Sequence, residues 1–312
     1  MNQEFAYWVI AYYHIIPIED PHEEVVQHKN FFHNRDIKSR IYISKEGINA
    51  QMSASPEAAD EYMRWISERY AGIEFKLHGS HEQVFPKAIV KVRKQLVAMD
   101  CQVDLTRRGV HLTPEEWKKM LKAKGEHTVL IDVRNGYEWA IGHFEGAELP
   151  ACDTFRQFPL YVQALKKEID PKATPVMMYC TGGIRCEFAS AYMLQEGFEQ
   201  VFQLKGGIID YGLQEGADYW QGKLFVFDDR LVVPIADQEE TTTISFCTHC
   251  KCTNDVYYNC ANIDCNALFL CCLSCLHEHK GCCSSSCMQA KRVRPYHTDG
   301  SSKPFRKMKE EK

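Results

Sequence analysis

The stretch TPVMMYCTGGIRCE at residues 174–187 decides the fold of the middle of this 312-residue chain. An apolar run ends at Cys180, two glycines follow, and a helical pattern begins near Ile184. A continuous apolar strand that leads through glycines into a helix is typical of a parallel sheet with helices on both faces. Ligands gather at the carboxyl edge of such sheets. The sequence therefore predicts that Cys180 lies where an α/β fold places its functional groups.

The composition of this turn favours an exposed, ionised thiol. Glycines let backbone N–H groups converge on one point, and the start of a helix and the charge of Arg185 both stabilise a thiolate. The predicted N–H donors are Thr181, Gly182, Gly183 and Ile184. Cys180 is thus a candidate nucleophile, although a lone strand-end cysteine is commonly a small buried hydrophobe. Cys186 can resolve an oxidised Cys180 or simply pack in its helix, and both interpretations are open.

Charged residues near this loop invite catalytic roles. For Asp132, Arg134 and His143, in the motifs DVR and GHF, we favour a role in bracing the fold. Glu138 is expected to lie on a solvated face, and Glu187 to cap a helix.

Periodicity and turn signals divide the chain. Two helices start with clear caps, Ser55 before Pro56 and Thr113 before Pro114, the latter completed by Glu116 as a capping box. The order strand–helix–strand–strand–helix–strand in the first part predicts a split βαβ, α+β domain with an antiparallel sheet. The expected segments are this domain at 1–99, a linker at 100–124, the parallel-sheet α/β domain at 125–222, a linker at 223–245, a cysteine-rich segment at 246–290 and a basic tail at 291–312.

Composition limits the class of protein. The N-terminus has no basic region before its apolar run, and His14 and Asp20 interrupt that run, so we expect neither a signal peptide nor a membrane span and place the protein in the cytoplasm. The net charge is −5, but residues 288–312 hold eight basic and three acidic residues. This tail can track an anionic polymer or be a solvated terminus.

The cysteine-rich segment predicts bound metal. Eleven of the 15 cysteines lie between Cys247 and Cys287, and disulfides are unexpected in a reducing compartment. Four short-spaced pairs can supply eight thiolates for two closed, structural zinc sites: Cys247 and Cys250, Cys260 and Cys265, Cys272 and Cys275, and Cys283 and Cys287. Sequential and interleaved pairing remain open, a histidine can replace a thiolate, and an iron–sulfur cluster is an alternative.

Several motifs carry a resemblance to a known family. LIDVRNGYEWAIGHFEGAELP at 130–150, YCTGGIRCE at 179–187 and VFQLKGGI at 201–208 resemble the rhodanese domain, and the six-residue loop from Cys180 to Arg185 has the length found in sulfur-handling rhodaneses. Together with YISKEGINA at 42–50, KVRK at 91–94 and VFDDR at 226–230, they resemble the bacterial tRNA uridine(34) hydroxylase (TrhO) family over nearly the whole chain.

The resemblance implies a tRNA-modifying oxidoreductase. Its expected reaction is oxygen-dependent hydroxylation of C5 of the wobble uridine, position 34, to 5-hydroxyuridine, with molecular oxygen as cosubstrate and no organic cofactor evident. We expect Cys180 to attack C6 of uracil while loop N–H groups and Arg185 hold the enolate. A persulfide-carrying sulfurtransferase and a non-enzymatic RNA-binding module are the alternatives.

An enzyme that acts on the anticodon must grip RNA phosphates. Lys91, Arg93 and Lys94 fall in what we expect to be the last strand of the first domain, and Arg107 and Arg108 follow. Lys45, in the family motif KEGIN with Glu46 and Asn49, is a further candidate RNA contact. An ordinary charged strand and a simple hairpin are the alternatives.

Overall fold

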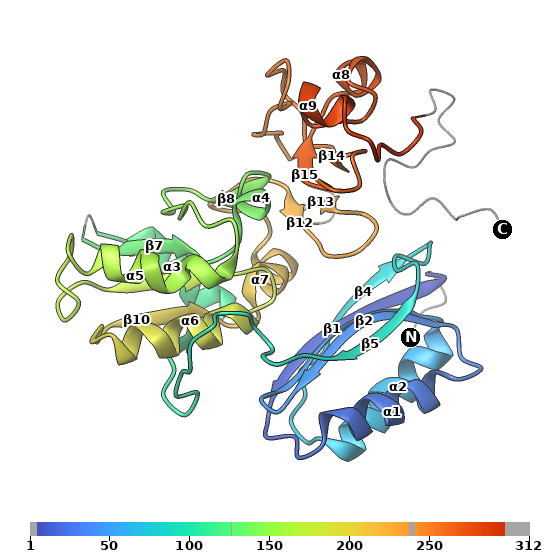
Figure 1. The fold of residues 1–312 in the computed structure, drawn as a ribbon. Helices are drawn as coiled ribbons and strands as arrows, with labels where there is room; N and C mark the ends of the chain where they lie inside the picture. The colour runs from blue at the N-terminus through green and yellow to red at the C-terminus, as the bar shows by residue number, and fades with distance from the viewer. Residues whose placement is uncertain (1–4, 126, 237–240, 297–312) are drawn as a thin grey trace.

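The protein consists of a first domain, a central α/β domain and a small cysteine-rich module (Figure 1). The computed structural model describes residues 5–125, 127–236 and 241–296. The expected basic tail therefore lies outside the described residues from residue 297 onward, as does part of the acidic stretch before the cysteine-rich module. Among the described residues no helix is long and apolar enough to cross a membrane.

The first domain is a five-stranded sheet with two helices. Its elements are β1 (Tyr7–Ile15), α1 (Pro21–Phe32), β2 (Ile37–Ser44), β3 (Gly47–Ala54), α2 (Pro56–Arg69), β4 (Lys76–Ser80) and β5 (Ala88–Val92). The strand order is β4-β1-β3-β2-β5. The split βαβ prediction is confirmed, but β5 pairs with β2 in parallel, so the sheet is not wholly antiparallel. The expected N-cap of α2 is present: the Ser55 hydroxyl accepts a hydrogen bond from the Ala58 N–H at 3.3 Å.

One face of this sheet is covered and the other is turned toward the central domain. In Figure 1, α1 and α2 lie on the side away from the central domain. Along β3, Ile48, Ala50 and Met52 are 0–1% exposed in the core beneath these helices, whereas Asn49 and Gln51 between them are half-buried. Because side chains alternate along a strand, the half-buried residues belong to the face without helices.

The central domain is a parallel sheet between helices, as predicted. Its elements are β6 (Val110–Leu112), α3 (Pro114–Ala123), β7 (Val129–Asp132), α4 (Gly136–Trp139), β8 (Gly142–Phe144), η1 (Phe155–Gln157), α5 (Phe158–Leu165), β9 (Val176–Tyr179), α6 (Ile184–Gln195), β10 (Val201–Leu204), α7 (Gly207–Glu215) and β11 (Trp220–Gly222). The order β6-β10-β9-β7 puts β9 inside the sheet. Thr113 and Glu116 form the expected capping box of α3.

Alternation along β9 builds a core on each face of the sheet. Met178 and Cys180 pack with Phe188 of α6 and Val162 of α5, whereas Met177 and Tyr179 pack on the other face with residues of α3 and α7. All four positions from Met177 to Cys180 are 0% exposed. Burial on both faces explains the continuous apolar run.

The cysteine-rich module follows a short hairpin. β12 (Leu224–Phe225) and β13 (Val232–Val233) precede β14 (Tyr257–Asn259), β15 (Leu268–Leu270), α8 (Leu273–Glu278) and α9 (Ser285–Met288). The Tyr257 hydroxyl donates to the Tyr137 carbonyl at 2.7 Å, and Lys223 forms an ion pair with Asp255. These contacts attach the module beside α4, where Figure 1 shows it.

Candidate active site and metal centres

The Cys180 loop connects the end of β9 to the start of α6. Gly183 precedes the helix with a φ of +99°, a conformation that favours glycine. The start of α7 holds the loop in place by two backbone hydrogen bonds. The N–H groups of Ile208 and Ile209 donate to the carbonyls of Cys180 and Thr181 at 3.0 and 3.1 Å. Gly207 permits this approach, because a Cβ there would lie 2.5 Å from the Cys180 carbonyl oxygen.

The surroundings of Cys180 favour a thiolate. Burial opposes its ionisation, but a hydrogen bond from the Cys186 thiol, the charge of Arg185 and backbone N–H groups of both residues lower the pKa of Cys180 to about 6. The Gly183 N–H also points at the sulfur, at 3.1 Å. Burial and the adjacent Cys180 raise the pKa of Cys186 well above its usual value, so the proton resides on Cys186.

Arg185 is held by a buried carboxylate. Its two terminal nitrogens contact the two oxygens of Glu138 at 2.5 and 2.6 Å, and the Thr181 hydroxyl donates to the same carboxylate at 3.1 Å. Glu138 is 0% exposed, so the expectation of a solvated face is wrong. Burial opposes its ionisation, but Arg185 outweighs burial and lowers the pKa of Glu138. Glu138 therefore fixes the cation that stabilises the thiolate.

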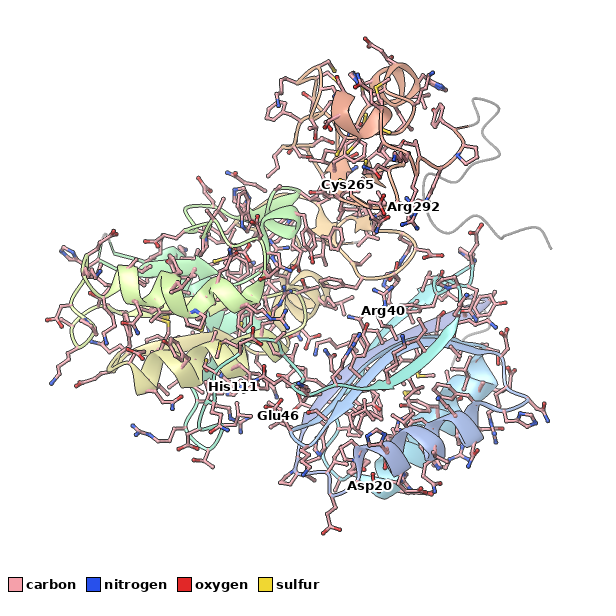
Figure 2. All side chains as sticks on the ribbon, in the orientation of Figure 1. Asp20, Arg40, Glu46, His111, Cys265 and Arg292 are labelled. Atoms are coloured by element: carbon pink, nitrogen blue, oxygen red, sulfur yellow. The ribbon has the colours of Figure 1, made fainter. Side chains whose placement is uncertain are left out.

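Glu187 joins the two larger domains. It accepts hydrogen bonds from the Tyr13 hydroxyl of β1 at 2.8 Å and from Arg108 at 3.1 Å, and it contacts the His111 ring at 2.9 Å. At 2% exposure it is not the simple helix cap that the sequence suggested. Arg108, expected as a phosphate contact, is instead paired with this buried carboxylate. Figure 2 shows His111 and Glu46 on either side of the domain junction.

A pocket of about 430 Å³ lies between the Cys180 loop and the helix-free face of the first sheet. The loop contributes Cys180, Thr181, Gly182, Ile184 and Arg185, and the sheet contributes Tyr13, Arg40, Tyr42, Asn49, Gln51 and Lys76. Arg40 lies on the side of the sheet that faces the central domain (Figure 2). Cys180 borders this pocket but is 0% exposed, so the expectation of an exposed thiol is wrong. The pocket thus reaches the loop that carries the sulfur, while the Cys180 side chain itself is covered.

The basic residues expected to bind RNA are exposed but occupy different elements. Lys45 lies in the turn between β2 and β3, and Lys91 lies on β5 beside Tyr42. Arg93 and Lys94 follow the end of β5. The expectation that they belong to this strand is therefore wrong. The Arg93 guanidinium lies 4.6 Å from the centre of the Tyr42 ring.

Two further motif residues have structural contacts. Glu46 of KEGIN accepts the Leu96 N–H at 2.8 Å and so fixes the chain that leaves the first domain. Asp132 and Arg134 form a fully buried ion pair, with a closest separation of 2.6 Å, and Arg134 also donates to the Gly142 carbonyl. His143 hydrogen-bonds to the Trp139 carbonyl. These contacts are of the kind expected if Asp132, Arg134 and His143 brace the fold.

The eight predicted metal-binding cysteines form two groups of four. Cys247 and Cys250 meet Cys272 and Cys275, while Cys260 and Cys265 meet Cys283 and Cys287. The first pair thus joins the third and the second joins the fourth, which resolves the pairing as interleaved.

The spacing of the sulfur atoms fits a tetrahedral metal site. Within each group all ligand atoms lie within 4.8 Å of one another, and the Cys250–Cys272 and Cys265–Cys283 sulfurs are 3.6 and 3.7 Å apart. Four sulfurs at about 2.3 Å from a zinc ion would be separated by about 3.8 Å. Each group can therefore hold one metal ion.

The remaining cysteines and histidines of the module lie outside these groups. Cys271 and Cys282 are 0% exposed and belong to the small core, and Cys252 is exposed. His249 and His279 stack with ring centres 3.7 Å apart, and His277 accepts or donates a hydrogen bond with the Tyr296 hydroxyl. The sequence spacing alone did not exclude these remaining cysteines and histidines as metal ligands.

Comparisons with protein families divide the chain in the same order as the structure. Residues 7–96 match the UPF0176 acylphosphatase like domain, residues 113–213 match the rhodanese-like domain, and residues 221–288 match the rhodanase C-terminal family.

Curated relatives match almost the whole chain. A tRNA uridine(34) hydroxylase of Protochlamydia amoebophila is 53% identical over 309 residues, covering 98% of this chain and 96% of the relative. A protein of the same name from Chlamydia trachomatis serovar D is 51% identical over 307 residues, covering 97% and 93%. Among solved structures, the rhodanese-like domain of an Anabaena protein matches with 19% identity and a TM-score of 0.31, over 43% of this chain and 91% of that domain.

Proposed function

The chain belongs to the tRNA uridine(34) hydroxylase family, and on that basis we propose that it hydroxylates C5 of the wobble uridine of tRNA with molecular oxygen. It is a tRNA-modifying enzyme, and its product is 5-hydroxyuridine. The observation that carries the proposal is the Cys180 thiolate, with a pKa of about 6, at the end of a pocket between two domains.

The thiolate activates the base by addition. Uracil C5 is weakly nucleophilic until a group adds at C6, and a thiolate suits this addition. Cys180 attacks C6, and the electron pair moves through C5 onto O4 as an enolate. N–H groups of the loop and the charge of Arg185 stabilise the anion. C5 then forms a bond to oxygen, and loss of the C5 proton with release of Cys180 restores the ring.

The pair of thiols balances the electrons. Hydroxylation by molecular oxygen places one oxygen atom on C5 and reduces the other to water, which consumes two electrons and two protons. Cys180 and Cys186 supply the two electrons as they become a disulfide, Cys186 supplies one proton, and solvent supplies the other because Cys180 starts as a thiolate. Uridine, oxygen, one thiolate, one thiol and one proton thus give 5-hydroxyuridine, water and one disulfide. Their hydrogen bond supports this resolving role for Cys186. An external thiol must then reduce the disulfide before the next turnover.

Binding of tRNA opens the route to the sulfur. The anticodon base must leave its stack to enter a pocket, and Cys180 is 0% exposed before this happens. Exposed Lys45, Lys91, Arg93 and Lys94 on the first domain contact the RNA backbone, and these contacts draw the first domain away from the loop.

Zinc occupies the two groups of four cysteines in this proposal. Four thiolates leave no open coordination position, so the ions stabilise the module and take no part in the reaction.

The test of this function is mass spectrometry of tRNA nucleosides from cells that lack their own 5-hydroxyuridine enzymes. The cells receive the wild-type chain, Cys180→Ser or Cys101→Ser. Cys101 is a partly buried cysteine outside the loop and serves as the control. We expect 5-hydroxyuridine with wild type and Cys101→Ser, and none with Cys180→Ser.

Two results would overturn the proposal. Equal 5-hydroxyuridine with Cys180→Ser would remove the cysteine from the mechanism. Absence of the product with soluble wild-type protein, combined with efficient sulfur transfer from thiosulfate, would favour a sulfurtransferase, because the same loop can carry a persulfide.

A further inference from the structure

The sheet wall of the pocket carries a row of side chains that crosses four strands. Tyr13 of β1 pairs with Asn49 of β3, Asn49 pairs with Tyr42 of β2, and Tyr42 pairs with Lys91 of β5. Residues paired in register on adjacent strands project from the same face. Tyr13, Asn49 and Tyr42 all line the pocket. A carboxamide thus lies between two phenol rings, across the pocket from the loop that holds Cys180.

Among the described residues, Asn49 is one of the polar groups of this row that remain available to a ligand. The Tyr13 hydroxyl is used by Glu187 at 2.8 Å, whereas the Asn49 carboxamide makes no hydrogen bond to any residue that the structure describes. Its half-buried position in the pocket restricts its access to water. A carboxamide in such a position gains most from a ligand that offers both a donor and an acceptor.

A cation lies near each of the two tyrosine rings of the same row. The Lys76 ammonium lies 5.5 Å from the centre of the Tyr13 ring, and the Arg93 guanidinium lies 4.6 Å from the centre of the Tyr42 ring. Aromatic rings beside cations suit a base that is attached to an anionic backbone.

Addition of the thiolate at C6 takes place from one face of the uracil ring, so the edge that carries N3–H and O4 stays free to meet a wall of the pocket. The sheet wall offers Asn49 to that edge. We propose that Asn49 reads the base there: its carbonyl accepts the N3–H, and its NH₂ group donates to O4. This inference rests on the proposed function. It also gives Asn49 a part in the chemistry, because O4 carries the negative charge after addition at C6.

The inference is tested by binding, separately from turnover. Full-length, zinc-loaded protein is titrated without oxygen against two anticodon stem-loops that differ only at position 34, one with uridine and one with 3-methyluridine, which lacks the N3–H. We expect wild type to bind the uridine stem-loop about tenfold more tightly, since a buried polar group left unpaired costs roughly 1–3 kcal/mol. Asn49→Ala should bring the ratio of the two Kd values close to one.

The matched control is Asn30→Ala, at an exposed asparagine on α1, on the other side of the sheet. It should keep the wild-type ratio, and both variants should keep the wild-type Tm. Equal binding of the two stem-loops by wild type, or an unchanged ratio in Asn49→Ala, would overturn the inference. If discrimination depends on Asn49 but wild type forms no 5-hydroxyuridine in cells, the base-reading role stands and the hydroxylase proposal fails.

Discussion

At the scale of single residues, the proton between Cys180 and Cys186 determines reactivity. The two thiols share one buried environment, yet the pKa of Cys180 is lowered to about 6 and that of Cys186 is raised. The difference arises because Arg185 and the loop N–H groups converge on the Cys180 sulfur, whereas the Cys186 thiol donates a hydrogen bond to that sulfur. A reactive cysteine is therefore distinguished from a packed one by the direction of its hydrogen bonds.

This asymmetry predicts a pH profile. Because only the thiolate reacts with iodoacetamide, alkylation of Cys180 should rise with pH, reach half its maximum near pH 6 and level off above neutrality. An unperturbed thiol would reach half-maximum at about 8.5. Peptide mass spectrometry after timed alkylation gives the profile for each cysteine. In Cys186→Ala the midpoint should shift upward, and a wild-type midpoint above pH 8 would contradict the thiolate assignment.

The electron balance gives a second prediction at this scale. One turnover with tRNA and oxygen, without added reductant, should leave a disulfide between Cys180 and Cys186, detected as a linked peptide under non-reducing conditions. Without tRNA the linked peptide should form much more slowly, since Cys180 is 0% exposed. Formation of 5-hydroxyuridine in stoichiometric yield by Cys186→Ala would show that another reductant supplies the electrons.

At the scale of elements, the start of α7 sets the shape of the Cys180 loop. Gly207 has a φ of +70°, and a Cβ there would lie 2.5 Å from the Cys180 carbonyl oxygen and 2.7 Å from the Gly183 nitrogen. Gly207→Ala should therefore lower the free energy of unfolding by about 1–3 kcal/mol and displace the loop. Chemical denaturation and the alkylation profile of Cys180 measure the two effects.

The control for this change is Gly197→Ala. Gly197 has a similarly positive φ of +94°, but a Cβ there would meet nothing within 4 Å. It should lose about 1 kcal/mol from backbone strain alone and keep the Cys180 profile. Equal effects of the two substitutions would show that strain at α7, and not the close approach, accounts for the loss.

At the scale of the whole molecule, Tyr13 and Glu187 hold the first domain against the loop. Tyr13→Phe removes the 2.8 Å hydrogen bond between the domains, so the pocket should open more often and maleimide, a bulkier reagent than iodoacetamide, should react faster with Cys180. Tyr7→Phe makes the same chemical change at the other end of β1 and should leave the rate unchanged. A maleimide rate that is equal in wild type and Tyr13→Phe would place the opening motion elsewhere.

The interleaved cysteines predict the metal content. The full chain should bind two zinc ions, measured by elemental analysis, and a chelator should unfold the cysteine-rich module before the two larger domains. Cys250→Ser should lose one ion, whereas Cys252→Ser should keep both, although both cysteines are exposed. Iron with visible absorbance would contradict the zinc assignment.

The sequence by itself determined the elements and the chemical groups. Caps at Ser55 and Thr113, the apolar run before Cys180 and the spacing of the cysteine pairs are local patterns, and each fixes structure within a few residues. The alternation in INAQMSA also carried the signal for a polar face at Asn49 and Gln51.

Only the tertiary structure decided which of these groups meet. The burial of Glu138 and Glu187, the closure over Cys180, the pocket against the first sheet and the interleaving of the metal sites all join residues that are far apart in the chain. Glu187 and Tyr13, for example, are separated by 174 positions. The sequence around Glu187 has the same charge pattern whether its helix is exposed to solvent or buried, so this pattern cannot tell the two apart. The difference arises from the packing of one domain against another, which no short stretch of sequence encodes.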